Sequence, residues 1–215
     1  MARLVIFDLD GTLLNTLEDL ADAANYVLRQ HGFPEHPLDA YRYFVGDGIA
    51  VLIQRILPET YRQGTVFEQC RQAFVTRYTQ HMYDKTLVYD GMHDTLRSLQ
   101  TKGIKMAVAT NKIHQAVAPL MADYFPDVHF SAIFGQRKGI PTKPNPQIVF
   151  DILKDTGFSK DETLYVGDTS VDMQTAHAAG LKAAGALWGY RTRQELEEAN
   201  ADFIIAHPSE LLTLV

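Results

Sequence analysis

Residues 4–12, with the sequence LVIFDLDGT, decide the fold of this chain because they join an apolar strand to a turn rich in carboxylates. Residues 4–7 are typical of a buried strand, and Asp8 and Asp10 follow directly. Since side chains alternate along a strand with a period of two, we expect these two aspartates to point the same way. Carboxylates so close repel each other unless a cation binds or one is protonated. The segment therefore predicts a metal or acid–base site, with an ordinary Asp-Gly turn as the alternative.

Five further short apolar segments recur along the chain, and helix-like stretches follow most of them. They are residues 105–109, 132–134, 163–166, 182–186 and 202–205. This alternation predicts an α/β fold with a Rossmann-like parallel sheet that binds ligands at the carboxyl ends of its strands. Helix boundaries are also marked, by Asn145-Pro146 at a start and by Gly103, Gly157 and Gly180 at ends.

The interval between the first two strands, roughly 95 residues, is far longer than the ~12 residues that a simple crossover needs. It begins with apolar residues at helical spacing, which predict a helix. Thr16 and Asp19 are expected to form the capping box at its start, and it is expected to end near Gly32. Helix-like patterns return near residues 51–57 and 67–81. This interval therefore predicts an inserted helical domain.

The domain organisation follows from this insertion. Residues 16–84 are expected to form a helical cap domain, and residues 1–15 together with 85–215 are expected to form the α/β core. The Gly46-Asp47-Gly48 segment is expected to be either a loop that approaches the ligand or a plain turn between helices. Tyr41, Tyr43 and Phe44 are expected to belong to the core of the cap.

Polar residues follow three of the later strands. Thr110 and Asn111 come at the start of an expected helix, where backbone amides favour anions, although Thr110 also suits a plain N-cap. Lys143 lies in a loop stiffened by prolines on both sides, which reduces the entropy lost in fixing a cation. Asp168 and Asp172 follow a buried strand and offer the oxygen ligands that Mg²⁺ prefers, with helix capping as the alternative.

Composition narrows the classes of function. The formal charge is −6 and there is no basic block, so a nucleic-acid partner is not expected. No apolar run approaches the length of a membrane span, and the single cysteine, Cys70, cannot form an internal disulfide. We expect a cytoplasmic protein that binds a small molecule. Whether it is a monomer or a homodimer stays open.

The four motifs in this order resemble those of the haloacid dehalogenase (HAD) superfamily: Asp8-x-Asp10-Gly11-Thr12, then Thr110, Lys143, and Gly167-Asp168 with Asp172. The resemblance implies the HAD fold with a cap, and a Mg²⁺-dependent phosphatase acting on a small phosphorylated metabolite through an aspartyl-phosphate. It implies these roles: Asp8 as nucleophile, Asp10 as general acid and base, Thr110, Asn111 and Lys143 at the phosphate, Asp8, Asp10 and Asp168 at the metal, and Asp172 in support.

A narrower resemblance, carried by Thr110-Asn111-Lys112 and Leu187-Trp188-Gly189-Tyr190, is to the phosphoglycolate phosphatase group. A phosphosugar mutase, a pyrophosphatase, and a phospho-accepting signalling or binding module are the alternatives. Arg42, Arg55 and Lys112 could bind a substrate carboxylate, but a solvated face is the simpler expectation for each.

Overall fold

A computed structural model describes residues 2–215, and its centre is a six-stranded parallel sheet. The strand order is β5-β4-β1-β6-β7-β8. The bounds are β1 Leu4–Phe7, β4 Lys105–Ile113, β5 Ala132–Gln136, β6 Thr163–Gly167, β7 Lys182–Ala186 and β8 Phe203–Ile205. All six strands expected from the sequence are present, and the predicted α/β fold with a parallel sheet is confirmed.

Strand β4 is longer than expected, and this moves three site residues from a helix start into a strand. The sequence predicts a strand at 105–109 and a helix from Ile113, whereas β4 runs to Ile113 and α6 begins at His114. The reason is that β5 also continues, so that Ile113 pairs with Gln136 after an irregularity in the register beyond Ala109.

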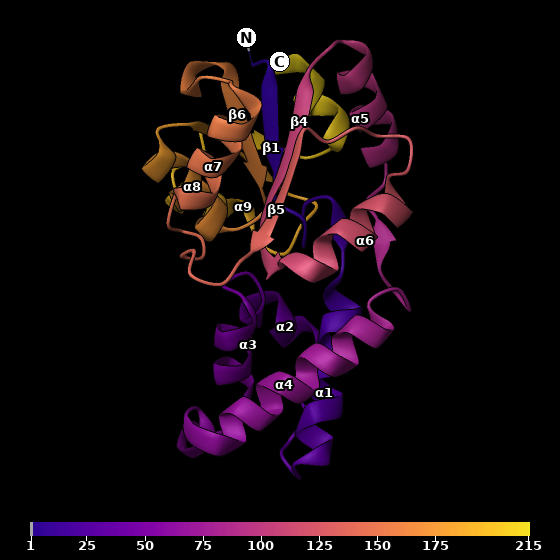
Figure 1. Cartoon of the computed structure of the whole chain (residues 1–215), viewed down its shortest axis with the longest axis vertical. Helices are drawn as coiled ribbons and strands as arrows, with labels where there is room; N and C mark the ends of the chain where they lie inside the picture. Colours follow the sequence, from indigo (N-terminus) through magenta and orange to yellow (C-terminus); the bar gives the residue numbers. More distant parts are fainter. Residues whose placement is uncertain (1) are drawn as a thin grey trace. The chain divides into compact units, whose positions relative to one another are not determined.

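Helices cover both faces of this sheet (Figure 1), as the right-handed crossover rule requires when the strand order reverses. On one face lie α5 Met92–Thr101 and α6 His114–Tyr124. On the other lie α7 Gln147–Thr156, α8 Ser170–Ala179 and α9 Arg193–Glu198. The side chains of β1 are therefore fully buried, which explains its unbroken apolar run.

The reversal of strand order occurs at β1, because β4 and β6 flank it and the chain proceeds outward in opposite directions from there. Crossover connections diverge at such a point and leave a crevice at the carboxyl ends of the strands. Asp8 follows β1, Thr110 lies near the end of β4, and Asp168 follows β6. The topology thus gathers the predicted motifs at one edge of the sheet.

The chain divides into two compact units, one made of the residues up to Leu14 with Val88–Val215 and the other of Asn15–Leu87. The second unit is helical, with α1 Leu17–Gln30, α2 Leu38–Phe44, α3 Ile49–Ile56 and α4 Gly64–His81. Helix α1 packs against α2 and α4 through its buried face. Short strands β2 Leu14–Asn15 and β3 Leu87–Val88 pair where the chain passes between the units.

The expected capping box at the start of α1 is wrong. The Thr16 side chain makes no capping hydrogen bond, and Asp19 is buried with its carboxylate elsewhere. That carboxylate accepts from the backbone N–H of Lys85 at 3.0 Å and from the N–H and hydroxyl of Thr86 at 2.9 and 2.7 Å. Three donors outweigh the one that a cap would offer, so Asp19 ties the two ends of the helical unit together.

The predicted glycines at the C-terminal ends of two helices are confirmed. Gly157 and Gly180 are the C-caps of α7 and α8, with φ of 76° and 79°, a region that favours glycine.

Candidate active site

The carboxylate of Asp8 is buried just beyond β1. Its backbone N–H donates to the carbonyl oxygen of Val166 at 2.9 Å, so the residue stays tied to β6 although β1 ends at Phe7. Its Oδ1 lies 2.9 Å from Nζ of Lys143, with which it forms a buried ion pair. An ionised carboxylate has about four acceptor positions on its two oxygens, so Asp8 retains capacity for a further partner.

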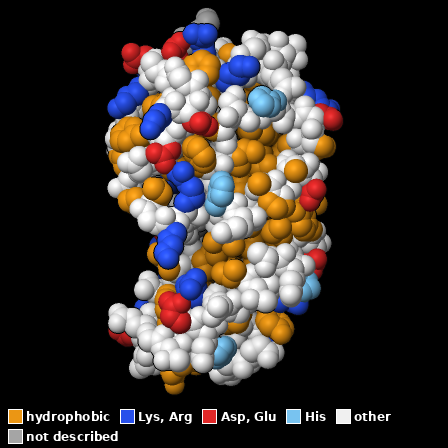
Figure 2. All heavy atoms as spheres, in the orientation of Figure 1, with side chains coloured by type: hydrophobic (Ala, Val, Ile, Leu, Met, Phe, Trp, Pro, Cys, Tyr) orange, Lys and Arg blue, Asp and Glu red, His pale blue; other side chains and the backbone are white. Residues whose placement is uncertain are grey.

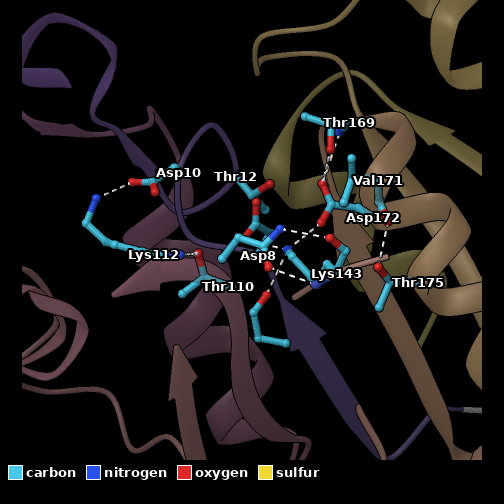
Figure 3. A network of polar contacts seen from close by, with 12 residues as sticks. Asp8, Asp10, Thr12, Thr110, Lys112, Lys143, Thr169, Val171, Asp172 and Thr175 are labelled. Carbon is cyan, nitrogen blue, oxygen red and sulfur yellow. Dashed lines mark hydrogen bonds and ion pairs between the residues drawn. The ribbon is translucent and has the colours of Figure 1, made fainter. Parts of the chain in front are cut away.

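Asp10 turns away from Asp8 and toward Lys112 (Figure 3). Its Oδ1 lies 2.7 Å from Nζ of Lys112, and the two side chains are 13% and 3% exposed. The expected common direction of the two aspartates is wrong because the strand, and with it the alternation of side chains, ends at Phe7. The expectation of a solvated Lys112 is wrong as well, since the extended β4 carries it into the interior.

Lys143 connects the motifs at the centre of the site. Besides Asp8, its Nζ lies 2.7 Å from Oδ1 of Asp172. It also donates to the carbonyl oxygen of Ala109 at 3.0 Å and to the hydroxyl of Tyr165 at 3.1 Å. Burial by itself would lower the pKa of Lys143, but the charges of Asp172 and Asp8 hold it well above its usual range. Lys143 is thus a fixed positive charge between two carboxylates.

Asn111 holds the loop that carries Lys143. Its Oδ1 accepts from the backbone N–H of Lys143 at 2.8 Å, and its Nδ2 donates to the carbonyl oxygen of Lys143 at 3.1 Å. The sequence predicts phosphate binding by Asn111, whereas these two bonds engage both ends of its amide. Thr110 is buried beside it, and its hydroxyl accepts from the backbone N–H of Lys112 at 3.2 Å.

Asp168 and Asp172 are fully buried after β6, and each is fixed by its own donors. Oδ1 of Asp168 accepts from the Thr12 hydroxyl at 3.1 Å, and Oδ2 accepts from the backbone N–H of Tyr190 at 2.8 Å. Oδ2 of Asp172 accepts from the N–H and the hydroxyl of Thr169 at 3.1 and 2.8 Å, which forms the cap of α8. The sequence offered helix capping by Asp168 as the alternative, but the N-cap of α8 is Thr169, and Asp172 is its partner in the capping box. The carboxylate of Asp172 also holds Lys143.

The pKa values show that the site carries too much negative charge for its degree of burial. Burial raises the pKa of Asp8 to about 7, against the opposing charge of Lys143 and with the help of Asp172 and Asp10. Burial, followed by the charges of Asp172 and Asp8, raises the pKa of Asp168 well above its usual range. A bound cation would relieve this repulsion.

The donor set fits Mg²⁺. Among the residues that the structure describes, Asp8, Asp168 and Asp172 bring carboxylate oxygens within 4.8 Å of one another. Hard oxygen ligands suit Mg²⁺, and the carboxylates of Asp8 and Asp168 supply them here. Both oxygens of Asp172 already accept from Lys143 or Thr169, so this residue suits the supporting role expected from the sequence better than direct coordination.

Residues 188–190 complete the site, although no chemical role was expected for them from the sequence. The indole Nε1 of Trp188 donates to the carbonyl oxygen of Thr12 at 2.9 Å, and Tyr190 holds Asp168 as described. A Cβ at Gly189 would lie 2.2 Å from Cβ of Asp168, which explains why the loop has glycine there. The signal was a Trp-Gly-Tyr motif just after a predicted strand, at the ligand-binding edge of the sheet.

In the helical unit, some of the predictions for individual side chains are confirmed and others are wrong. Arg55 lies 2.7 Å from Asp47 and donates to the carbonyl oxygens of Tyr43 and Phe44, so it holds the glycine-flanked turn in place. Arg42 is solvated, as expected. Tyr41 is fully buried, but the assignment of Tyr43 to the core is wrong, because it is 53% exposed. It lines a groove of about 600 Å³ together with Phe44, Val51, Gln54, Arg55, Arg62 and Gln63.

On the face shown in Figure 2, Lys and Arg side chains are interspersed with Asp and Glu rather than gathered into one basic patch. Of the helices in residues 2–215, none has the length and apolar character needed to cross a membrane.

Comparison with known proteins identifies one family match and several similar phosphatases. The family described as haloacid dehalogenase-like hydrolase matches residues 5–186. A phosphoglycolate phosphatase of Haemophilus influenzae (strain 86-028NP) is 32% identical over 219 residues, which cover 99% of this chain and 98% of that protein. One from Pseudomonas putida (strain KT2440) is 34% identical over 209 residues, covering 95% and 76%.

Among solved structures, the crystal structure of a predicted phosphoglycolate phosphatase from Haemophilus somnus 129PT superposes with a TM-score of 0.91. It is 28% identical in sequence, and the match covers 99% of this chain and 97% of that one. The resemblance drawn from the four motifs is thereby confirmed. The chain belongs to the haloacid dehalogenase-like hydrolases, and within that family it is a phosphoric monoester hydrolase.

Proposed function

We propose that the chain hydrolyses a small phosphate monoester, with phosphoglycolate as the first candidate, through a phosphorylated Asp8 and with Mg²⁺ bound. The observation that carries the proposal is the Asp8 carboxylate, which is buried and whose Oδ1 lies 2.9 Å from Nζ of Lys143. A fixed nucleophile beside a fixed cation is what attack on a phosphoryl group requires. The names of the similar proteins supply the candidate substrate.

The metal would be held by the carboxylates of Asp8 and Asp168 and by the backbone carbonyl of Asp10, with Asp172 in support. Bound Mg²⁺ would offset the negative charge of the carboxylates and of the phosphate and keep Asp8 ionised.

In the first chemical step, a carboxylate oxygen of Asp8 bonds to phosphorus and the bond from phosphorus to the ester oxygen breaks. Asp10 gives its proton to that departing oxygen, which leaves as the alcohol. In the second step, Asp10 takes a proton from water, the water oxygen bonds to phosphorus, and the bond to Asp8 breaks to release phosphate. Thr110 and Lys143 orient and balance the phosphoryl oxygens throughout.

We include in this proposal that the helical unit Asn15–Leu87 is the cap expected at residues 16–84.

The test is phosphate release from phosphoglycolate, sugar phosphates, nucleotides and pyrophosphate, each with Mg²⁺ and with a chelator. Turnover is expected with Mg²⁺ and is expected to disappear in Asp8→Asn, while the matched control Asp94→Asn, at a side chain 89% exposed, retains it. Activity of Asp8→Asn well above background would contradict the nucleophile. Isomerised sugar phosphate without released phosphate would point to a mutase.

A second measurement addresses the intermediate. Acid-quenched Asp10→Asn protein, incubated with 4-nitrophenyl phosphate, whose leaving group needs no proton, is expected to yield a phosphorylated peptide containing Asp8, because the step that needs a base is slowed. Unmodified peptide at every time point, from a variant that still binds substrate, would contradict the covalent route.

A further inference from the structure

Lys112 carries a buried positive charge whose use the proposed reaction does not explain. Its side chain is 3% exposed, and its Nζ lies 2.7 Å from Oδ1 of Asp10. Figure 3 shows this pair on one side of Asp8, with Lys143 and Asp172 on the other. Lys143 is already committed to Asp8 and Asp172. Burying an ammonium group costs several kcal/mol of desolvation, so a pair of this kind calls for an explanation.

Lys112 also lies close to where the phosphate would bind. It is two residues beyond Thr110 on β4, so the two Cα atoms are at most about 7 Å apart. The Lys112 backbone N–H donates to the Thr110 hydroxyl at 3.2 Å, which links the two residues within β4. A small phosphate monoester held at Thr110 therefore has its remaining groups within reach of the Lys112 ammonium.

The group that the ammonium holds is a carboxylate belonging to Asp10. The carboxylate of a substrate has the same charge and shape, so the Asp10–Lys112 contact shows that this position accommodates a carboxylate. Exchange of one carboxylate for another would keep the buried ammonium paired at each stage. An uncharged group in the same place would leave it unpaired, which buried sites disfavour strongly.

We propose that Lys112 is a specificity-determining residue, whose ammonium exchanges the Asp10 carboxylate for the carboxylate of the substrate. The exchange releases Asp10 to turn toward the departing ester oxygen, so substrate recognition and the readiness of Asp10 are linked. This inference rests on the proposed phosphatase function and deepens it. It makes a carboxylate next to the phosphate ester a condition for rapid turnover, and it gives a role to Lys112 that is distinct from that of Lys143.

The experiment compares phosphoglycolate with carbamoylmethyl phosphate, its uncharged amide of nearly the same shape. The ratio of their kcat/KM values is measured for the wild type and for Lys112→Met, which keeps the length of the side chain and removes its charge. We expect the ratio to fall by about 10- to 100-fold in Lys112→Met, the range for losing a hydrogen bond to a charged group. Lys112→Arg, which keeps the charge, is expected to restore part of it.

Lys105→Met is the matched control, because Lys105 is exposed at the opposite end of the same strand and should leave both values unchanged. A second measurement does not depend on turnover. Calorimetric titration of Asp8→Asn with both compounds should show tighter binding of phosphoglycolate, and adding Lys112→Met should abolish the difference. This binding test also serves if Lys112→Met alone proves too unstable to assay for turnover, with Lys112→Gln in its place.

The outcomes separate the inference from the proposed function. Equal losses for both substrates in Lys112→Met, or equal kcat/KM values in the wild type, would overturn the inference while leaving the phosphatase intact. Failure of the wild type to release phosphate from any compound would contradict the proposed function instead. In that case, equal binding of the two compounds by Asp8→Asn would overturn the inference as well.

Discussion

Replacing Gly189 by alanine adds one methyl group where two segments of the active site meet. The new Cβ would lie 2.2 Å from Cβ of Asp168 and 2.5 Å from the carbonyl oxygen of Gly11. Ordinary contact begins near 3.4 Å, so the first distance is about 1.2 Å too short. Neither neighbour is a flexible side-chain end, because one is backbone and the other is the Cβ of a fully buried aspartate. The loop and Asp168 must therefore move apart.

Overpacking of this kind costs about 1–3 kcal/mol of the free energy of unfolding. In a chain of 215 residues that corresponds to a Tm lower by roughly 2–12 °C. Movement also weakens the hydrogen bond from Tyr190 that orients the Asp168 carboxylate. A displacement of about 1 Å at a catalytic site lowers the rate by about 100-fold, so we expect a loss of this order in kcat/KM. We also expect weaker binding of Mg²⁺.

The assay is phosphate release as a function of Mg²⁺ concentration, together with thermal unfolding and Mn²⁺ binding followed by electron paramagnetic resonance. Gly103→Ala is the control, because a Cβ there meets nothing within 4 Å. That control has only the backbone cost of a positive φ, about 1–2 kcal/mol, and should keep its metal affinity. If Gly189→Ala keeps kcat/KM within about twofold and binds Mn²⁺ as the wild type does, the positioning role of the 188–190 loop is refuted.

Asp8→Asn should lower kcat by at least about 10³-fold. It should nevertheless raise the Tm of the metal-free protein at pH 8, because it removes a negative charge whose burial is unfavourable. A lower Tm would contradict this account. The pKa of Asp8 is raised from 3.8 to about 7, so the folded state binds its proton more tightly than the unfolded state, and this group's contribution to stability is lost as the pH rises through 7. Mg²⁺, which binds the ionised form, should therefore raise Tm more at pH 8 than at pH 5, and equal gains in thermal unfolding at the two pH values would be inconsistent with that pKa. Asp19→Ala should lower the free energy of unfolding by about 2–4 kcal/mol, since three donors of Lys85 and Thr86 lose their acceptor, and a change below about 0.5 kcal/mol in denaturant titrations would show that water replaces the carboxylate.

Strand positions and the edge that carries the site could be read from the sequence. Residues 4–7 and 182–186 were predicted with the bounds that the structure has, because residues 4–7 and 183–186 form unbroken runs that are buried in the sheet. The gathering of Asp8, Thr110 and Asp168 followed from one rule, that parallel strands end at the same edge. Such patterns are local, so they survive without knowledge of the tertiary structure.

The directions of side chains just beyond the strands could not be read in this way. Asp10 departs from the alternation because β1 ends at Phe7, and Lys112 is buried because β4 extends alongside β5. The role of residues 188–190 depends on contacts to Thr12 and Asp168 across more than twenty residues of chain. No periodicity encodes such contacts.

The sequence by itself determined the α/β class, the parallel strands, the helical insertion and the aspartates that follow β1 and β6, because each depends on hydrophobic periodicity or on a short motif. Only the tertiary structure decided which charges pair: Lys143 with Asp8 and Asp172, and Lys112 with Asp10. The physical reason is that ion pairing in a buried site depends on distances of a few ångströms between separate strands and loops. Those distances are fixed by packing and not by the spacing of residues along the chain.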